Sequence, residues 1–249
     1  MLKLDDEFFA NFDAVLFDLD GVITDTARVH ANAWKQMFDA YLVSKARDEG
    51  KVRLFDAESD YLGYVDGKPR YDGVRSFLES RGIQLPWGDP SDFPEMETIC
   101  GLGNRKNQLV NEILETDGVF VFPGSVAMLK CLREHATKMA IVSSSKNCET
   151  VLRIAGLMEY FDARVDGRVA AERNLPGKPA PDTFLDASRE LGVDPKRAVV
   201  IEDALSGVEA GRAGGFGLVI GVSRHGEAES LKAAGADIVV PDLAALLED

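Results

Sequence analysis

Short apolar runs alternate along the chain with segments whose apolar residues recur every three or four positions. Each run is rich in Val, Ile, Leu, Ala or Phe and has almost no polar residue within it, which is typical of a β-strand covered on both faces. The runs occupy residues 14–17, 139–143, 198–201, 216–222 and 238–240. We interpret them as the strands of one buried sheet.

Helical spacing separates these runs. Val126, Leu129 and Leu132 lie three apart, and similar patterns recur around Val151 and Phe184. Strands that alternate with helices favour parallel pairing, with helices on both faces of the sheet. The sequence therefore predicts a doubly wound, Rossmann-like α/β fold.

Residues 31–117 break this rhythm, because they contain no clear buried strand. Apolar residues recur there at helical spacing, at Trp34, Met37, Phe38, Tyr41 and Leu42, at Val74, Phe77 and Leu78, and at Leu109, Val110, Ile113 and Leu114. We predict a core domain formed by residues 1–30 and 118–249, with a mostly helical cap domain, residues 31–117, inserted after the first strand.

The acidic net charge of the chain argues against some classes of binding partner. The chain has 42 acidic and 28 basic residues, a net charge of −14, which argues against broad binding of nucleic acid or an anionic membrane. No run reaches the roughly 18 apolar residues that a membrane span needs, and the N-terminus is acidic. We expect a cytoplasmic protein, a monomer, with buried thiols at Cys100, Cys131 and Cys148 and with His135 and His225 structural or exposed.

The first candidate motif places Asp18 and Asp20 at the end of an apolar strand, with Gly21 next. Beyond the strand the backbone is free to turn, so both carboxylates can converge at the carboxyl edge of the sheet, where ligands of such folds bind. Gly21 permits a tight turn. The alternative is a solvated acidic loop.

Two further motifs offer phosphate-binding groups. Ser143, Ser144 and Ser145 precede Lys146 and Asn147 at a strand end before a helix, where hydroxyls and helix amides can cradle a phosphate. Lys178 lies between Gly177 and Pro179 and precedes another helix, so a rigid loop can present its charge to a phosphate. Helix capping and an ordinary surface lysine are the alternatives.

A fourth motif places Glu202 and Asp203 at the end of a strand, before a helix rich in small residues. Grouped carboxylate oxygens suit a hard cation such as Mg²⁺. Helix capping by Asp203 or Ser206 is the alternative. The four motifs together predict an acidic, metal-assisted site for a phosphorylated substrate.

These four motifs, in this order, resemble the haloacid dehalogenase (HAD) superfamily over residues 12–30 and 118–249. The resemblance implies that Asp18 is a nucleophile that becomes an aspartyl phosphate and that Asp20 is the general acid and base. It also implies phosphate binding by Ser143, Ser144 and Lys178, and Mg²⁺ binding by Asp18, Asp20, Glu202 and Asp203.

A narrower resemblance is to the β-phosphoglucomutase-like subfamily, over residues 14–26, 30–35, 143–147 and 177–182. It implies that the substrate-binding residues are Thr26, His30, Lys68, Arg70, Ser145, Lys146 and Asn147, and that the cap closes over a small sugar phosphate. The cap is longer than is usual for that subfamily, around residues 45–60 and 85–103, and a second basic patch follows at residues 104–107.

Three functions therefore stay open. A phosphomutase that converts β-glucose 1-phosphate to glucose 6-phosphate is the first, and a sugar-phosphate phosphatase on the same scaffold is the second. A phospho-accepting receiver module of signalling proteins is the third, because it shares the doubly wound pattern with an Asp cluster. The helical insertion and the Asp two residues after the first speak against the receiver.

Overall fold

A computed structural model describes residues 3–46, 52–65, 68–224 and 226–247. The chain divides into two compact units, one formed by Met1–Thr26 and Val119–Asp249 and the other by Ala27–Gly118. We describe the first as the core unit and the second as the helical unit. His225 lies outside the described residues.

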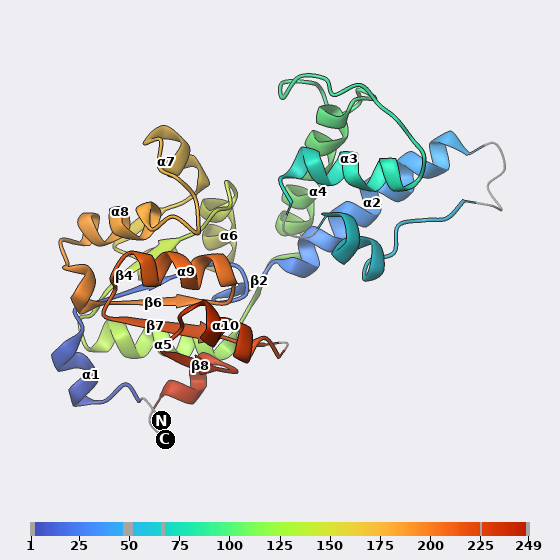
Figure 1. The fold of residues 1–249 in the computed structure, drawn as a ribbon. Coiled ribbons are helices and arrows are strands. Elements are labelled where there is room, and N and C mark those ends of the chain that lie inside the picture. Colours follow the sequence, from blue (N-terminus) through green and yellow to red (C-terminus); the bar gives the residue numbers. More distant parts are fainter. Residues whose placement is uncertain (1–2, 47–51, 66–67, 225, 248–249) are drawn as a thin grey trace. The chain divides into compact units, whose positions relative to one another are not determined.

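The core unit is built on a six-stranded parallel sheet, which confirms the predicted fold class (Figure 1). Its strand order is β5-β4-β1-β6-β7-β8. The strands are β1 (Ala14–Phe17), β4 (Lys138–Val142), β5 (Ala163–Val165), β6 (Ala198–Glu202), β7 (Leu218–Val222) and β8 (Ile238–Val240). Strand β1 lies between β4 and β6, so its carboxyl end opens at the centre of the sheet edge.

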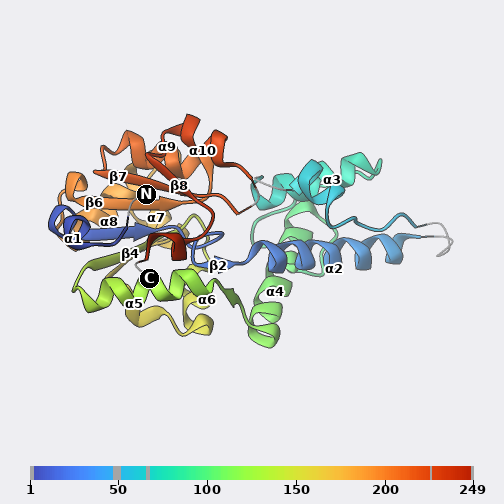
Figure 2. The same cartoon turned by 90° about the horizontal axis from the view of Figure 1, so that it is seen from below.

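Helices cover both faces of this sheet (Figure 2). The helices α8 (Asp182–Leu191), α9 (Leu205–Ala213) and α10 (Ala228–Ala234) share one hydrophobic core with Leu16, Ala140 and Val200 of the strands. The helix α5 (Pro123–Glu134) lies on the opposite side, as Figure 2 shows. Because strand residues alternate between faces, the fully apolar strands bury side chains on both sides.

Strand β5 is absent from the sequence-based prediction. It has only three residues and carries Arg164 at its centre, so neither its length nor its composition signals a buried strand. It pairs with β4 at the edge of the sheet, where one side needs no partner strand. The short helices α1 (Asp6–Asn11), α6 (Cys148–Ala155) and α7 (Gly167–Glu172) complete the core unit, together with three short 3₁₀ segments among its described residues.

A second, two-stranded sheet joins the two segments that enter and leave the helical unit along the chain. Strand β2 (Thr24–Asp25) pairs in antiparallel fashion with β3 (Phe120–Val121). Phe122 continues this pairing by donating its backbone N–H to the carbonyl of Ile23 at 3.0 Å. Both segments belong to the core unit.

The helical unit consists of α2 (Ala27–Lys45), α3 (Arg70–Ser80) and α4 (Ile99–Asp117), with a π-helical turn at Tyr61–Val65. The predicted helical stripes form its core, in which Trp34, Met37, Phe38, Phe77 and Leu78 are buried. The rings of Phe38 and Phe77 lie 4.1 Å apart between centroids. This cluster is separate from the core beneath the sheet.

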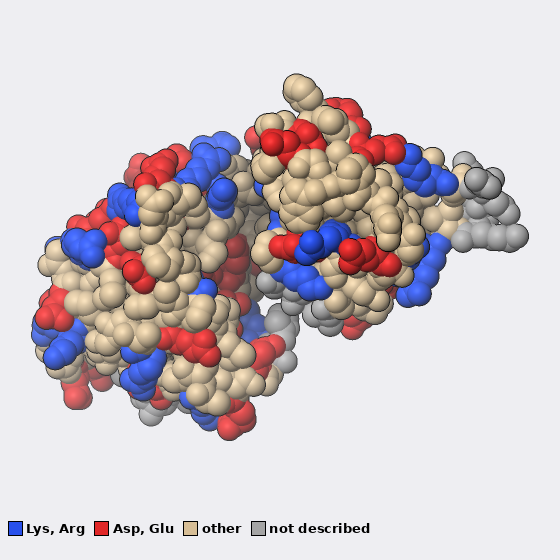
Figure 3. Space-filling model, turned by 45° about the horizontal axis from the view of Figure 1, so that its top comes forward, with Lys and Arg blue, Asp and Glu red and all other residues tan. Residues whose placement is uncertain are grey.

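The cysteine prediction needs one correction. Cys100 and Cys148 are buried, but Cys131 is half-exposed, because it lies on the outer side of α5. Within the described residues no helix is long and apolar enough to cross a membrane. On the face drawn in Figure 3, acidic and basic side chains are interspersed and form no continuous basic field.

Candidate functional site

A cavity of about 280 Å³ opens at the carboxyl ends of β1, β4 and β6. It is lined by Asp18, Asp20, Ser143, Ser144, Ser145, Lys178, Glu202, Asp203, Ala204 and Ser206. All four sequence motifs contribute to it. Their convergence follows from the parallel sheet, which brings the carboxyl ends of successive strands to one edge.

Lys178 is the cation at the centre of this cavity. Its Nζ lies 2.5 Å from Asp18 Oδ1 and 2.6 Å from Glu202 Oε1, and it donates to the carbonyl of Val142 at 3.0 Å. Its side chain is only 7% exposed, and its ammonium lies 4.9 Å above the ring of Phe184. Lys178 is therefore a buried site residue and not a surface lysine.

The balance of charge around Lys178 determines the protonation of the cluster. Burial acts to lower the pKa of Lys178, but the carboxylates of Asp18 and Glu202 outweigh it and raise that pKa. Burial raises the pKa of Asp18, and the carboxylates of Glu202 and Asp203 raise it further against the opposing effect of Lys178. One ammonium does not neutralise the carboxylates that face it.

Asp203 has the same excess of negative charge around it. Burial and the neighbouring carboxylate of Glu202 raise the pKa of Asp203 to about 7. Asp18, Glu202 and Asp203 each offer a ligand oxygen, and these atoms lie within 4.8 Å of one another. Three converging carboxylates with raised proton affinity fit a divalent cation, because the cation would replace the missing positive charge.

Glu202 is the most constrained of the three. It is fully buried, and its Oε2 accepts a hydrogen bond from the backbone of Ala204 at 2.9 Å while Oε1 faces Lys178. A Cβ at Gly207 would lie 1.7 Å from Glu202 Oε1, so the small residue of α9 makes room for the carboxylate. The N-cap residue of α9 is Ala204, so Asp203 does not cap this helix.

Asp20 lies beside the cluster in a different environment. It is half-buried, and the hydroxyl of Thr26 donates a hydrogen bond to its Oδ1. Burial raises the pKa of Asp20, and the Thr26 hydroxyl partly offsets that effect. Gly21 follows at a φ of 84°, and a Cβ there would lie 1.8 Å from Asp203 Oδ2, so only glycine fits.

The serine loop is ordered by its own hydroxyls. Ser145 donates its backbone N–H to Ser143 Oγ, and Asn147 donates its own to Ser145 Oγ, both at 3.1 Å. Ser143 is buried, whereas Ser144 and Lys146 are exposed. Asn147 occupies the N-cap position of α6 but makes no side-chain cap hydrogen bond. The loop thus presents hydroxyls and a helix end at the edge of the cavity.

In the helical unit, the side chains of His30 and Lys106 meet. Lys106 donates from Nζ to His30 Nδ1 at 2.6 Å, and its ammonium lies 4.9 Å above the ring of Trp34. Burial and, to a smaller extent, the guanidinium of Arg70 lower the pKa of Lys106 to about 7. Burial and the charge of Lys106 lower the pKa of His30 to about 3, so its ring accepts as a neutral imidazole.

The cap residues proposed from sequence separate in the structure. Arg70 begins α3, its guanidinium lies 5.1 Å over the ring of Tyr71, and its buried Nε has no hydrogen-bond partner among the described residues. Lys68 is exposed and donates to Ser76 Oγ at 2.7 Å. Lys106 had no role of its own among the residues predicted from the sequence.

A signal for Lys106 was present in the sequence. Lys106 lies four residues after Leu102 and four before Val110, both of which are buried on α4. A charged residue in the middle of a buried helical stripe either has a partner or serves a function. Trp87, which the sequence left unassigned, is 43% exposed and lies under the guanidinium of Arg75.

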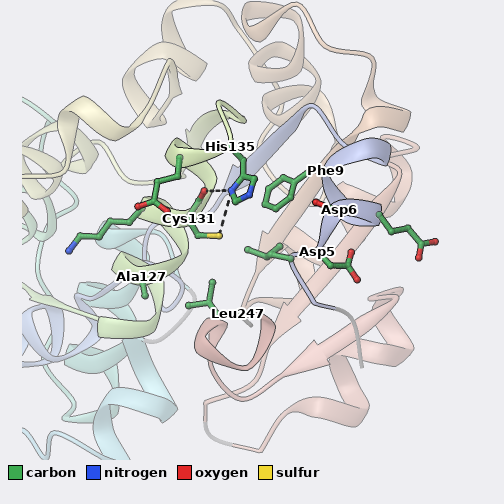
Figure 4. Close-up of a pocket in the computed structure, with 11 residues that line it drawn as sticks. Asp5, Asp6, Phe9, Ala127, Cys131, His135 and Leu247 are labelled. Carbon is green, nitrogen blue, oxygen red and sulfur yellow. Dashed lines mark hydrogen bonds between the residues drawn. The ribbon is translucent and has the colours of Figure 1, made fainter. Parts of the chain in front are cut away.

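The core unit also has a larger groove, of about 650 Å³, away from this chemistry (Figure 4). It lies near α1 and the end of α5, at the amino edge of the strands. His135 stacks on Phe9 with ring centroids 3.8 Å apart, and its Nδ1 lies 4.0 Å from the sulfur of Cys131. The groove has no buried cation paired with carboxylates, so its size alone does not make it the candidate site.

Buried carboxylates around one buried lysine, beside a hydroxyl-rich loop at the carboxyl edge of a parallel sheet, are the features of an enzyme that acts on phosphate esters. The chain belongs to the haloacid dehalogenase-like hydrolases, whose family model matches residues 12–215. It is an enzyme of that family, which includes phosphotransferases and phosphatases. This confirms the family resemblance seen in the motifs.

Individual relatives refine the comparison. The β-phosphoglucomutase of Mycobacterium bovis is 52% identical over 238 residues, which cover 94% of this chain and 91% of the relative. Hexitol phosphatase A of Escherichia coli is 31% identical and covers 80% of this chain and 78% of its own length. The crystal structure of β-phosphoglucomutase from Clostridium difficile aligns with a TM-score of 0.67 at 28% identity and covers 94% of this chain and 93% of the neighbour.

Proposed function

We propose that this enzyme is a β-phosphoglucomutase, which converts β-glucose 1-phosphate to glucose 6-phosphate through an aspartyl phosphate on Asp18. The observation that carries the proposal is the ammonium of Lys178, 2.5 Å from the buried carboxylate of Asp18 at the edge of the sheet. A mutase that is 52% identical over nearly the whole chain supports the choice of substrate.

In the first half-reaction, a carboxylate oxygen of Asp18 attacks the phosphorus, and the bond from phosphorus to the sugar oxygen breaks. Asp20 donates its proton to that leaving oxygen, a role favoured by its raised pKa at a position next to the nucleophile. Lys178 holds the negative charge of the transferring oxygens, and the loop at residues 143–147 donates hydrogen bonds to the phosphate.

In the second half-reaction, the 6-hydroxyl of β-glucose 1-phosphate gives its proton to Asp20 and attacks phosphorus, so that the bond to Asp18 breaks. The resulting 1,6-bisphosphate then returns its 1-phosphoryl group to Asp18, and glucose 6-phosphate leaves. One side chain therefore serves as acid and as base in alternate steps.

The metal that we propose is Mg²⁺, held by Asp18, Glu202 and Asp203. When bound, it supplies positive charge that lets a carboxylate approach an anionic phosphate. Asp203 is the ligand that depends most on the metal, since its pKa of about 7 reflects a carboxylate without a cation of its own. Asp20 is not one of these three grouped carboxylates, so it would stay free to exchange a proton.

We propose that Arg70, Lys106 and His30 of the helical unit bind the sugar phosphate. Within the described residues, Arg70 has a buried Nε without a hydrogen-bond partner, and the buried ammonium of Lys106 faces the neutral imidazole of His30. An anionic substrate would supply an acceptor of opposite charge to both Arg70 and Lys106. We assign Lys68, Ser145, Lys146 and Asn147 smaller contributions, since Lys68 and Lys146 are exposed.

The second candidate is a sugar-phosphate phosphatase. The specific observation in its favour is the 31% identity with hexitol phosphatase A over 80% of this chain. Both enzymes form the same aspartyl phosphate and differ in whether water or a sugar hydroxyl attacks it. The family match to hydrolases gives no support to the third reading, a receiver module that is not an enzyme.

The deciding experiment supplies β-glucose 1-phosphate with a trace of the 1,6-bisphosphate and Mg²⁺, and follows glucose 6-phosphate and free phosphate together. A mutase forms glucose 6-phosphate in large excess over phosphate. Release of one phosphate for each substrate consumed, with no isomer, would refute the mutase and leave the phosphatase. Asp18→Asn is the control for enzyme-independent reaction.

A further inference from the structure

Arg224 lies just after β7, and its side chain reaches back to the turn that follows Asp20. Its Nε donates to the carbonyl of Gly21 at 2.7 Å, and its Nη2 to the carbonyl of Val22 at 3.3 Å. Its Nη1 pairs with Asp242 Oδ2 at 2.7 Å. The side chain is 13% exposed, so the guanidinium is largely removed from water.

The ring of Phe122 packs against one face of the Arg224 guanidinium. The guanidinium carbon of Arg224 lies 3.4 Å from the centroid of the Phe122 ring, a stacked cation–π contact. Phe122 in turn holds Ile23 through its backbone hydrogen bond. Arg224 therefore connects three segments that are far apart in the sequence: the turn after Asp20, the segment before α5, and the residues near the C-terminus.

The turn itself is closed by short backbone hydrogen bonds. Gly21 donates to the carbonyl of Thr24 at 2.7 Å, and both Ile23 and Thr24 donate to the carbonyl of Leu19 at 2.9 Å. These bonds use the carbonyls of Leu19 and Thr24 as acceptors and not those of Gly21 and Val22. Arg224 binds both carbonyls, and Ser125 Oγ donates to the second one at 2.6 Å.

The position of this turn controls two acidic side chains of the site. Asp20 is the residue directly before Gly21, and Gly21 packs so closely on Asp203 that a Cβ would lie 1.8 Å from Asp203 Oδ2. A movement of the turn would displace Asp20 from Thr26 and press on Asp203. Misplacement of a reacting group by about 1 Å can slow a reaction by about 10²-fold.

We propose that Arg224 is a positioning residue of the phosphoryl-transfer reaction, which fixes the turn at residues 20–22 and thereby holds Asp20 where it exchanges its proton. The inference rests on the proposed function for its catalytic consequence. Its structural part, that Arg224 holds the turn, stands independently of which reaction the enzyme performs.

The chemistry of arginine explains why a lysine could not do this. The planar guanidinium directs separate N–H groups to two carbonyls and one carboxylate, while its face packs on Phe122. A lysine ammonium could reach one or two of these acceptors but would lose the stacking and the fixed geometry. Arg224→Lys should therefore recover only part of the function that Arg224→Met loses.

The kinetic test compares Arg224→Met with Arg212→Met. Arg212 also pairs with an aspartate of the core unit, Asp237, at 2.7 Å, but it is 55% exposed and does not touch the turn. We expect Arg224→Met to lower kcat at least tenfold and to leave KM within about twofold, because the turn acts on Asp20 and not on substrate affinity. Millimolar guanidinium should restore part of kcat in this variant, and the control should match wild type.

A second measurement does not depend on activity. Amide hydrogen exchange at residues 21–24 should be at least about tenfold faster in Arg224→Met than in wild type and in the control, because the turn loses its anchor. If exchange and kcat both stay within twofold of wild type, Arg224 is not a positioning residue. If exchange rises but kcat does not fall, the turn is anchored by Arg224 but the catalytic inference is wrong.

The test also distinguishes a wrong inference from a wrong proposed function and from a variant that does not fold. If wild type turns over no sugar phosphate, the proposed function fails, and the exchange measurement still tests the anchor. If Arg224→Met does not fold, Asp242→Asn replaces it, because this change keeps the acceptor for the backbone of Ala244 while removing the charge that orients Arg224. Asp242→Asn should then show faster exchange at residues 21–24 and a smaller loss of kcat; wild-type behaviour in both would overturn the inference.

Discussion

At the scale of single residues, the candidate site depends on one lysine, Lys178, which pairs with two carboxylates. Lys178 Nζ lies 2.5 Å from Asp18 and 2.6 Å from Glu202, so it serves two carboxylates at once. A lysine buried without acids would lose its proton readily. Here the carboxylates of Asp18 and Glu202 raise the pKa of Lys178, which favours its charged form.

The first prediction concerns the nucleophile. Asp18→Asn should lower kcat by at least about 10³-fold, because an amide keeps the shape of the side chain but cannot attack phosphorus. The measurement is steady-state turnover together with the melting temperature. Asp162→Asn is the matched control, since Asp162 accepts a backbone hydrogen bond at the amino edge of the sheet. Retention of a tenth of wild-type activity in Asp18→Asn would show that Asp18 is not the nucleophile.

The second prediction concerns Lys106, whose folded-state pKa of about 7 lies below its ordinary value. Between these two pKa values the unfolded chain binds more protons than the folded protein, so this lysine makes stability rise with pH from about 7 to about 10.5. Below about pH 7 the folded protein must bury a charged ammonium.

The measurement for this prediction is urea unfolding of wild type and Lys106→Met across that pH range. The variant should be more stable than wild type near neutral pH, and the difference should shrink by at least about 1.4 kcal/mol as the pH rises to about 10. Arg105→Met is the control, because Arg105 is half-buried on the same helix and donates from Nε to the carbonyl of Pro94. A difference that is independent of pH would contradict the lowered pKa.

At the scale of elements, α8 connects the hydrophobic core to the site. Phe184 lies in its first turn, is fully buried, and packs against Phe216 with centroids 6.0 Å apart. The same ring lies beneath the ammonium of Lys178. The helix α8 thus contacts the buried ammonium of Lys178 and also covers one face of the sheet.

The third prediction follows from this packing. Phe184→Ala should lower the free energy of unfolding by about 3–5 kcal/mol, because it leaves a cavity under the sheet. Phe93→Ala is the matched control; Phe93 is 74% exposed, and its loss should change the free energy by less than about 0.5 kcal/mol. Chemical unfolding monitored by circular dichroism measures both. A loss below about 1 kcal/mol for Phe184→Ala would contradict the assigned packing.

At the scale of the whole molecule, the net charge of −14 would repel the anionic substrate that we propose. The acidic cluster adds to it locally, since burial and mutual repulsion raise the pKa of Asp18 and of Asp203. The Mg²⁺ that we propose would supply the positive charge that lets this site accept a phosphate. Low-salt conditions should therefore strengthen metal binding.

The fourth prediction concerns that metal. Chelation should abolish turnover and Mg²⁺ should restore it, while Mg²⁺ should also raise the melting temperature of wild type, because it binds the folded state. Asp203→Asn should lose most of that rise, and Asp162→Asn should keep it. Full activity in excess chelator, or an equal rise in Asp203→Asn, would contradict the assignment of these carboxylates to a metal.

The local sequence determined much of the core. Uninterrupted apolar runs identified β1, β4, β6, β7 and β8, because a strand covered on both faces carries apolar side chains on both and shows no polar alternation. Acidic and hydroxyl residues directly after such strands predicted the candidate site, and in the structure they line one cavity because parallel strands share one carboxyl edge. The family of the chain followed from the same residues.

Tertiary structure decided what depends on neighbours distant in the chain. β5 exists because β4 offers it a partner, although Arg164 interrupts its apolar pattern. Lys106 is buried because α2 brings His30 and Trp34 to it. Arg224 binds a turn that lies far earlier in the chain, since Gly21 precedes it by 203 positions. A sequence records the local preference of each residue, whereas burial, pKa and hydrogen-bond partners are set by packing between segments, and so only the folded chain determines them.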